Sequence, residues 1–141
     1  MASTQAGKAV NMIAGEDLNG DLYEALTVNA SGQVVKVTAA TDVIVGFLAE
    51  DPGRTTAAGT DTVPVAIVGG GGVLNAKAGA AITAGQIVVS HGATTVGTVA
   101  GVTGLAGLAA DIMGAGIALE AATAAGDIIA VLAMPLAGAN S

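Results

Sequence analysis

The sequence predicts an all-β protein, a small β-barrel or β-sandwich-like subunit built from two similar β units. Three observations predict it: an excess of β-branched residues, short apolar runs separated by turn residues, and an internal repetition. The chain of 141 residues contains 17 Val, 14 Thr and 9 Ile but only 10 Leu. Val, Ile and Thr favour strands over helices, because branching at Cβ restricts their side chains in a helix.

Nine short apolar runs are the predicted strands, and their regular spacing is typical of a barrel or a sandwich. They span residues 22–28, 33–38, 43–49, 63–68, 72–76, 86–90, 94–99, 116–121 and 127–132. The turn sequences between them include Asn19-Gly20, Ser31-Gly32, Asp51-Pro52-Gly53, the glycines 69–72, His91-Gly92 and Ala125-Gly126. One segment differs: Leu105, Leu108 and Ile112 would share one helical face. Residues 104–113 are therefore predicted to form either a short helix or an ordered loop.

The chain also repeats itself, which predicts one β unit in residues 17–68 and a similar one in residues 81–134. The matched residues are Gly46 with Gly116, Glu50 with Glu120, Ala57-Ala58-Gly59 with Ala124-Ala125-Gly126, and Gly20 with Gly85. Tight turns need glycine where the backbone adopts a positive φ. We expect a single β domain over residues 15–141, preceded by an extended N-terminal arm over residues 1–14.

The charge and the cysteine count exclude several classes of function. The net charge is −7, and the only cations are Lys8, Lys36, Arg54 and Lys77. A nucleic-acid partner is not predicted, because no basic face can be built to neutralise phosphates. The chain has no cysteine, so it forms no disulfide and no thiolate metal site. No membrane partner is predicted either, because the most apolar window, residues 99–119, contains Asp111 and consists largely of Gly and Ala.

The four glycines at 69–72 do not form a phosphate-binding loop. Such a loop requires Gly-Lys-Ser/Thr, whereas Gly72 is followed by Val73, Leu74 and Asn75. We expect the run to let the backbone cross between strands.

No other motif predicts a metal site or catalysis. Asp17, Asn19 and Asp21 alternate as in a calcium loop, but Leu22 and Val28 stand where that loop has Gly and Glu. We expect a turn with solvated carboxylates there instead. His91 is the only histidine and is predicted to be an exposed turn residue, and Glu50 and Glu120 follow matching strands of the repeat. The sequence predicts no catalytic residue, no cofactor and no metal, and the chain is not predicted to be an enzyme.

The order of the segments carries a resemblance. "NASGQVV" is followed by "DVIVGFLAED", "VPVAIVGGGGVLNAKAGAAITAGQIVV", "GTVAG" and "GIALEAATAAGDIIAVLA". Over residues 15–134 this is similar to the small capsid cement, or decoration, proteins of tailed bacteriophages, with matching residues at Gly72-Val73, 82–88 and 116–132. Two departures are a longer segment at 101–113 and "VVSHG" in place of the aromatic residues often found near the second turn.

The resemblance implies a structural virion protein, a homotrimer on the outer surface of the phage head that bridges neighbouring major capsid proteins. It would be made in the host cytoplasm. A core rich in Ala, of which the chain has 32, also favours oligomers because it buries little area per residue. In the arm, Lys8 is the only charge and Val10, Met12 and Ile13 form one apolar cluster, so these four are the expected capsid contacts.

Two alternatives remain open at this stage. One is a lipoyl- or biotinyl-like carrier domain, with Lys77 in "NAKAG" as the modified lysine. The other is a fibre-base protein or another exposed surface module.

Overall fold

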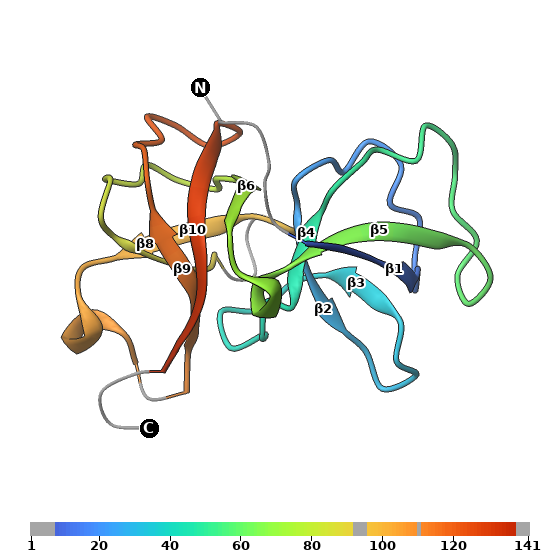
Figure 1. The fold of residues 1–141 in the computed structure, drawn as a ribbon, viewed down its shortest axis with the longest axis horizontal. Helices are drawn as coiled ribbons and strands as arrows, with labels where there is room; N and C mark the ends of the chain where they lie inside the picture. The colour runs from blue at the N-terminus through green and yellow to red at the C-terminus, as the bar shows by residue number, and fades with distance from the viewer. Residues whose placement is uncertain (1–7, 92–95, 110, 138–141) are drawn as a thin grey trace.

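The computed structural model describes residues 8–91, 96–109 and 111–137, and over these residues the protein is all-β, as the sequence predicted. Two five-stranded antiparallel sheets lie side by side (Figure 1). The strands are β1 (Ala9–Ile13), β2 (Ala25–Val28), β3 (Val34–Lys36), β4 (Gly46–Leu48), β5 (Thr62–Ile67), β6 (Val73–Lys77), β7 (Ile87–Ser90), β8 (Val99–Val102), β9 (Met113–Ala118) and β10 (Ile128–Ala137).

The two sheets have the same topology. The strand order is β1-β5-β4-β2-β3 in one and β6-β10-β9-β7-β8 in the other. Each strand of β1–β5, the first repeat, therefore corresponds to the strand five places later in β6–β10, the second repeat. The structure thus contains two similar β units, and the equivalence also includes β1 and β6, which lie outside the ranges that the sequence match covers.

Gly46 and Gly116 occupy equivalent positions in the two sheets. Gly46 of β4 pairs with β2 on one side and β5 on the other, and Gly116 of β9 pairs with β7 and β10. A Cβ at either glycine would overlap a carbonyl oxygen of the neighbouring strand, that of Ala66 or Leu132. Both positions therefore require glycine for the same reason, as the sequence match predicted.

The predicted match of Gly20 with Gly85 is wrong, because the equivalent of Gly85 is Tyr23. The Tyr23 N–H donates to the Leu48 carbonyl at 2.9 Å, and the Gly85 N–H donates to the equivalent Ala118 carbonyl at 2.8 Å. Tyr23 has a φ of 66° and Gly85 a φ of 92°. Gly20 also has a positive φ, but it lies in an Asn-Gly turn that the second repeat lacks.

Each sheet curls until its two edges meet at one parallel bridge, between Ala14 and Val34 in the first repeat and between Ala78 and Val99 in the second. Apolar side chains fill the interior of each curled sheet at matching positions. In the first repeat they are Ala14, Leu18, Leu26, Val34, Leu48, Val63 and Val65. In the second they are Ala78, Ile82, Val88, Val99, Ala118, Ile129 and Val131.

The two repeats pack through the outer face of the first sheet, the face that points away from its own interior. Ala25, Val37, Phe47 and Ala66 lie on this face and join the apolar cluster of the second repeat. Backbone hydrogen bonds cross the same contact: the Lys77 N–H donates to the Tyr23 carbonyl at 3.0 Å, and the Gly97 N–H donates to the Val37 carbonyl at 2.9 Å. Phe47, the only phenylalanine, thus belongs to the contact between repeats.

The glycine run connects the two repeats, which agrees with the predicted strand crossing. A single 3-10 turn, η1 (Val68–Gly70), follows β5, and β6 of the other sheet begins at Val73. Gly71 and Gly72 have φ values of 70° and 81°, which side chains rarely adopt. The chain therefore turns from one sheet into the next within a few residues.

Two details differ from the predicted elements. β1 was not predicted as a strand, and β8 begins where the predicted strand 94–99 ends, residues 94 and 95 lying outside the described residues. Of the two alternatives for residues 104–113, the described residues form the ordered loop, which contains the 3-10 turn η2 (Leu105–Gly107) and leads into β9. In the described part of the chain, no helix is long and apolar enough to cross a membrane.

Candidate interaction surface

Strand β1 is the part of the predicted arm that the structure describes, and it belongs to the first sheet. Its residues pair antiparallel with β5, from Ala9 opposite Ala66 to Ile13 opposite Thr62. Within the described residues β1 pairs with a strand along one side only, and its other side meets β3 at the single bridge between Ala14 and Val34, so the backbone groups before this bridge have no strand partner there. Residues 1–7 of the predicted arm lie outside the described residues.

The four expected capsid-contact residues separate into two kinds. Lys8 is exposed, and the side chains of Val10 and Ile13 are 37% and 44% exposed. Met12 is half-buried and packs against the interior of the first repeat. Met12 thus contributes to the core, and Lys8, Val10 and Ile13 are the residues that a partner can reach.

The equivalent strand β6 shows what is missing around β1. Leu74 and Ala76, the counterparts of Val10 and Met12, are completely buried. Leu74 lies opposite Val131 and Ala76 opposite Ile129 of β10, so both face the interior of the second repeat. β6 also contacts the first repeat, because the Lys77 N–H donates to the Tyr23 carbonyl, whereas no other repeat lies on β1 in the described part of the chain and Val10 remains 37% exposed.

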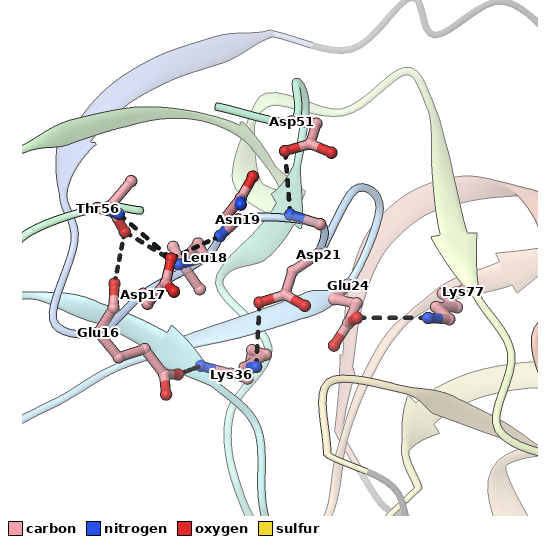
Figure 2. A network of polar contacts seen from close by, with 11 residues as sticks. Glu16, Asp17, Leu18, Asn19, Asp21, Glu24, Lys36, Asp51, Thr56 and Lys77 are labelled. Atoms are coloured by element: carbon pink, nitrogen blue, oxygen red, sulfur yellow. Dashed lines mark hydrogen bonds and ion pairs between the residues drawn. The ribbon is translucent and has the colours of Figure 1, made fainter. Parts of the chain in front are cut away.

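A polar network in the segment that follows β1 holds the loops of the first repeat together (Figure 2). Asp17 Oδ1 accepts hydrogen bonds from the backbone N–H of Asn19 at 3.0 Å and of Thr56 at 3.2 Å. The Thr56 hydroxyl accepts from the Leu18 N–H at 2.9 Å and donates to the Glu16 carbonyl at 2.7 Å. The predicted solvated turn is thus a connection between two loops, in which Asp17 binds backbone N–H groups.

Two ion pairs extend the network toward the second repeat (Figure 2). Lys36 Nζ lies 3.0 Å from Asp21 Oδ2, and Lys77 Nζ lies 3.4 Å from Glu24 Oε2. Burial, together with the negative charge of Asp21, raises the pKa of Glu24, and Lys77 offsets part of this. Burial disfavours the Lys36 charge, but the hydrogen bond and charge of Asp21 outweigh it and raise the pKa of Lys36.

These carboxylates have structural partners. Asp51 Oδ1 accepts from the N–H groups of Gly20 and Gly53, both at 3.0 Å, and these bonds lower the pKa of Asp51. In the residues that the structure describes, no three His, Asp or Glu side chains gather in a way that could hold a metal ion.

The chain matches no protein-family model, and no curated protein sequence is significantly similar to it.

Ser90 and His91, which are adjacent in the sequence, each have a structural role. His91 is half-buried, so its prediction as an exposed turn residue is wrong. Its N–H donates to the Thr98 carbonyl at 3.0 Å, and its ring packs over Gly79, where a Cβ would lie 2.6 Å from Nδ1. The buried Ser90 hydroxyl donates to the Ala39 carbonyl of the first repeat at 2.7 Å.

Glu50 and Glu120 occupy equivalent positions in different repeats and are not brought together. Glu120 Oε1 accepts from the Ala130 N–H at 2.8 Å. The equivalent of Ala130 is Pro64, which has no N–H to donate, and Glu50 is exposed.

Lys77, the candidate carrier lysine, is the last residue of β6, and its ammonium faces Glu24 of the first repeat. A carrier lysine is expected at a hairpin tip, so this position does not favour that alternative.

Proposed function

We propose that this protein is a capsid decoration, or cement, protein. It binds the outside of a tailed-phage head as a homotrimer and holds neighbouring major capsid proteins together. The sequence resemblance over residues 15–134 suggests this function, and one structural observation carries it: the exposed edge of β1 beside Lys8 and Val10. The corresponding edge of β6 supports the proposal, because there the Lys77 N–H donates to the Tyr23 carbonyl of the first repeat.

The edge of β1 can bind a shell in two ways. A strand from a capsid protein can pair with its backbone, which is how exposed sheet edges bind extended segments. Val10 is 37% exposed, so covering it completely would contribute roughly a third of the 1.5–3 kcal/mol that burial of a fully exposed side chain gives. A trimer presents three such edges, so weak individual contacts combine.

Stabilisation of the head follows from selective binding. If the protein binds the assembled mature shell and not its separated subunits, its binding free energy adds to the stability of the shell by mass action. Such a mechanism needs no catalytic group, which agrees with the structural roles of the Asp, Glu and Ser residues described above.

The test uses heads of the phage that encodes this chain, prepared without it. Lys8→Glu and Val10→Ser should reduce co-pelleting with these heads about tenfold or more, while Val43→Ser, a change at an exposed valine away from β1, should not. Circular dichroism checks that each variant keeps its strands. Full co-pelleting of the Lys8 and Val10 variants would overturn the proposed shell contact, and failure of the unaltered protein to bind would overturn the function.

A further inference from the structure

The outer face of the second sheet is the counterpart of the face through which the first repeat packs. Its residues Ile87, Val102, Ile117 and Leu132 are equivalent to Ala25, Val37, Phe47 and Ala66. The four residues of the first repeat are at most 1% exposed, whereas Leu132 is 37% exposed and Ile117 is half-buried. The same face is therefore covered in one repeat and partly open in the other.

A longer loop covers half of this face in the second repeat. Val102 comes 65 positions after its equivalent Val37, whereas Gly116 comes 70 positions after its equivalent Gly46. The loop between β8 and β9 is therefore five residues longer than the loop between β3 and β4. Leu108 of this loop is buried against Ile87 of β7. The half formed by β9 and β10 remains open, with Leu132 and, just after β9, Leu119 at 48% exposure.

The contact inside the chain shows what kind of surface fits this face. In the first repeat the flank of the other repeat covers this face in two places. The end of β6 at Lys77 bonds to Tyr23 beside β4, which corresponds to the open half, and the turn at Gly97 bonds to Val37, which corresponds to the half under the loop. The corresponding flank of the first repeat is formed by Ile13, at the end of β1, and the turn at Gly32, which has the same φ of 77° as Gly97. Ile13 is 44% exposed, so this flank is available to another molecule.

The two open surfaces also match in charge. Inside the chain, Lys77 of the flank forms an ion pair with Glu24 beside the face. The strand register makes Ile13 the equivalent of Lys77. Gln86 is the equivalent of Glu24, because the N–H of each donates to the carbonyl three residues earlier. The carbonyl of each accepts from the last residue of the neighbouring strand, Leu48 of β4 or Ala118 of β9. Both members of the ion pair are thus replaced by uncharged residues in the proposed contact.

We infer that the open half of the outer face, Leu119 and Leu132, binds the flank of the first repeat, at Ile13, in a second copy of this chain. The two surfaces differ, so the contact runs head to tail, and three copies that close into a ring satisfy it. This inference rests on the homotrimer of the proposed function and names its surfaces. It assigns Ile13 to the contact between subunits and leaves Lys8 and Val10 for the shell.

Sedimentation of the protein without any shell tests the inference. Leu132→Glu places a charge on the open outer face, and Ile13→Glu places one on the flank. Val43→Glu is the control, because it places the same charge on a valine that is 48% exposed and belongs to neither surface. Each of the first two variants should associate about tenfold more weakly or worse, and the Val43 variant should associate like the unaltered protein.

A mixture of the two defective variants gives the sharper result. The Leu132 variant still has its Ile13, and the Ile13 variant still has its Leu132, so one intact contact can form between them. We expect each variant alone to be monomeric and an equal mixture to form dimers but no trimers, which also shows that both remain folded. Absence of dimers in the mixture, or a Leu132 variant that associates normally, would overturn the inference but not the trimer. A monomeric unaltered protein would overturn both, whereas co-pelleting with heads tests shell binding separately.

Discussion

In the first repeat the outer face of the sheet lies under the second repeat, whereas the same face of the second repeat has a loop over one half and exposed leucines on the other. The strand order, the pairing partners and even the obligatory glycines, Gly46 and Gly116, are the same. What differs is the surroundings. Phe47 and Ala66 fit a tight contact, and their counterparts Ile117 and Leu132 are half-buried or exposed. The side chains on this face thus reflect what covers each repeat rather than its topology.

The largest effect expected from this difference is at Phe47. Phe47→Ala should lower the free energy of unfolding by about 3–5 kcal/mol, because the ring is fully buried between the repeats. Ile117→Ala, at the equivalent but half-buried position, should cost about 1–2 kcal/mol. Urea unfolding at equal protein concentrations measures both. Equal losses would show that the two faces are equally covered and would break the comparison.

The obligatory glycines should behave alike despite their different surroundings. Gly46→Ala and Gly116→Ala each force a Cβ into a backbone carbonyl, so each should cost roughly 1–3 kcal/mol or more. The control is Gly69→Ala, where a Cβ meets no atom within 4 Å and φ is not positive. Thermal unfolding gives the three values. If one of the pair resembled the control, the two strands would not be equivalent.

A smaller effect distinguishes the turns before β2 and β7. Gly85→Ala should destabilise the protein by about 1–2 kcal/mol, because alanine has to adopt a left-handed φ of 92° in open space. Tyr23 already has this strain at the equivalent position, so Tyr23→Gly should relieve it and partly compensate for the lost side chain. Urea midpoints decide between these outcomes; a stabilising Gly85→Ala would mean that the turn is not strained.

The smallest expected effect concerns pH. The pKa of Glu24 is raised above 4.5 by burial and by Asp21, so the folded protein holds this proton more tightly than the unfolded chain. The stabilisation that results is fully present below pH 4.5, and it is lost as the pH rises through the pKa that Glu24 has in the folded protein. Glu24→Gln, which copies Gln86 of the second repeat, cannot titrate. The stability of the unaltered protein relative to this variant should therefore fall as the pH rises above 4.5, and a constant difference would contradict the assignment.

The sequence predicted the fold class because β-branched residues favour strands locally, and it predicted the equivalence of Gly46 and Gly116 because both glycines keep their place in the repeated pattern. Strand β1 was missed because "AVNMI" has no strict alternation and is held by its pairing with β5. Tyr23 hid the true partner of Gly85, since no sequence rule expects tyrosine at a positive φ.

The surfaces could be predicted only in part. Lys8, Val10 and Ile13 stood out as an apolar cluster with a single charge, and they are accessible in the structure. That Leu132 is exposed where Ala66 is buried depends on how the two repeats pack. Such packing joins residues far apart in the chain and leaves no local pattern.

Electron cryomicroscopy of phage heads incubated with the protein tests the proposed function most directly. The account predicts three copies clustered on the outer surface of the shell, with the β1 edge of each first repeat against a capsid protein and the outer face of each second repeat against the next copy. Heads that carry no additional density, or density that places β1 away from the shell, would contradict it.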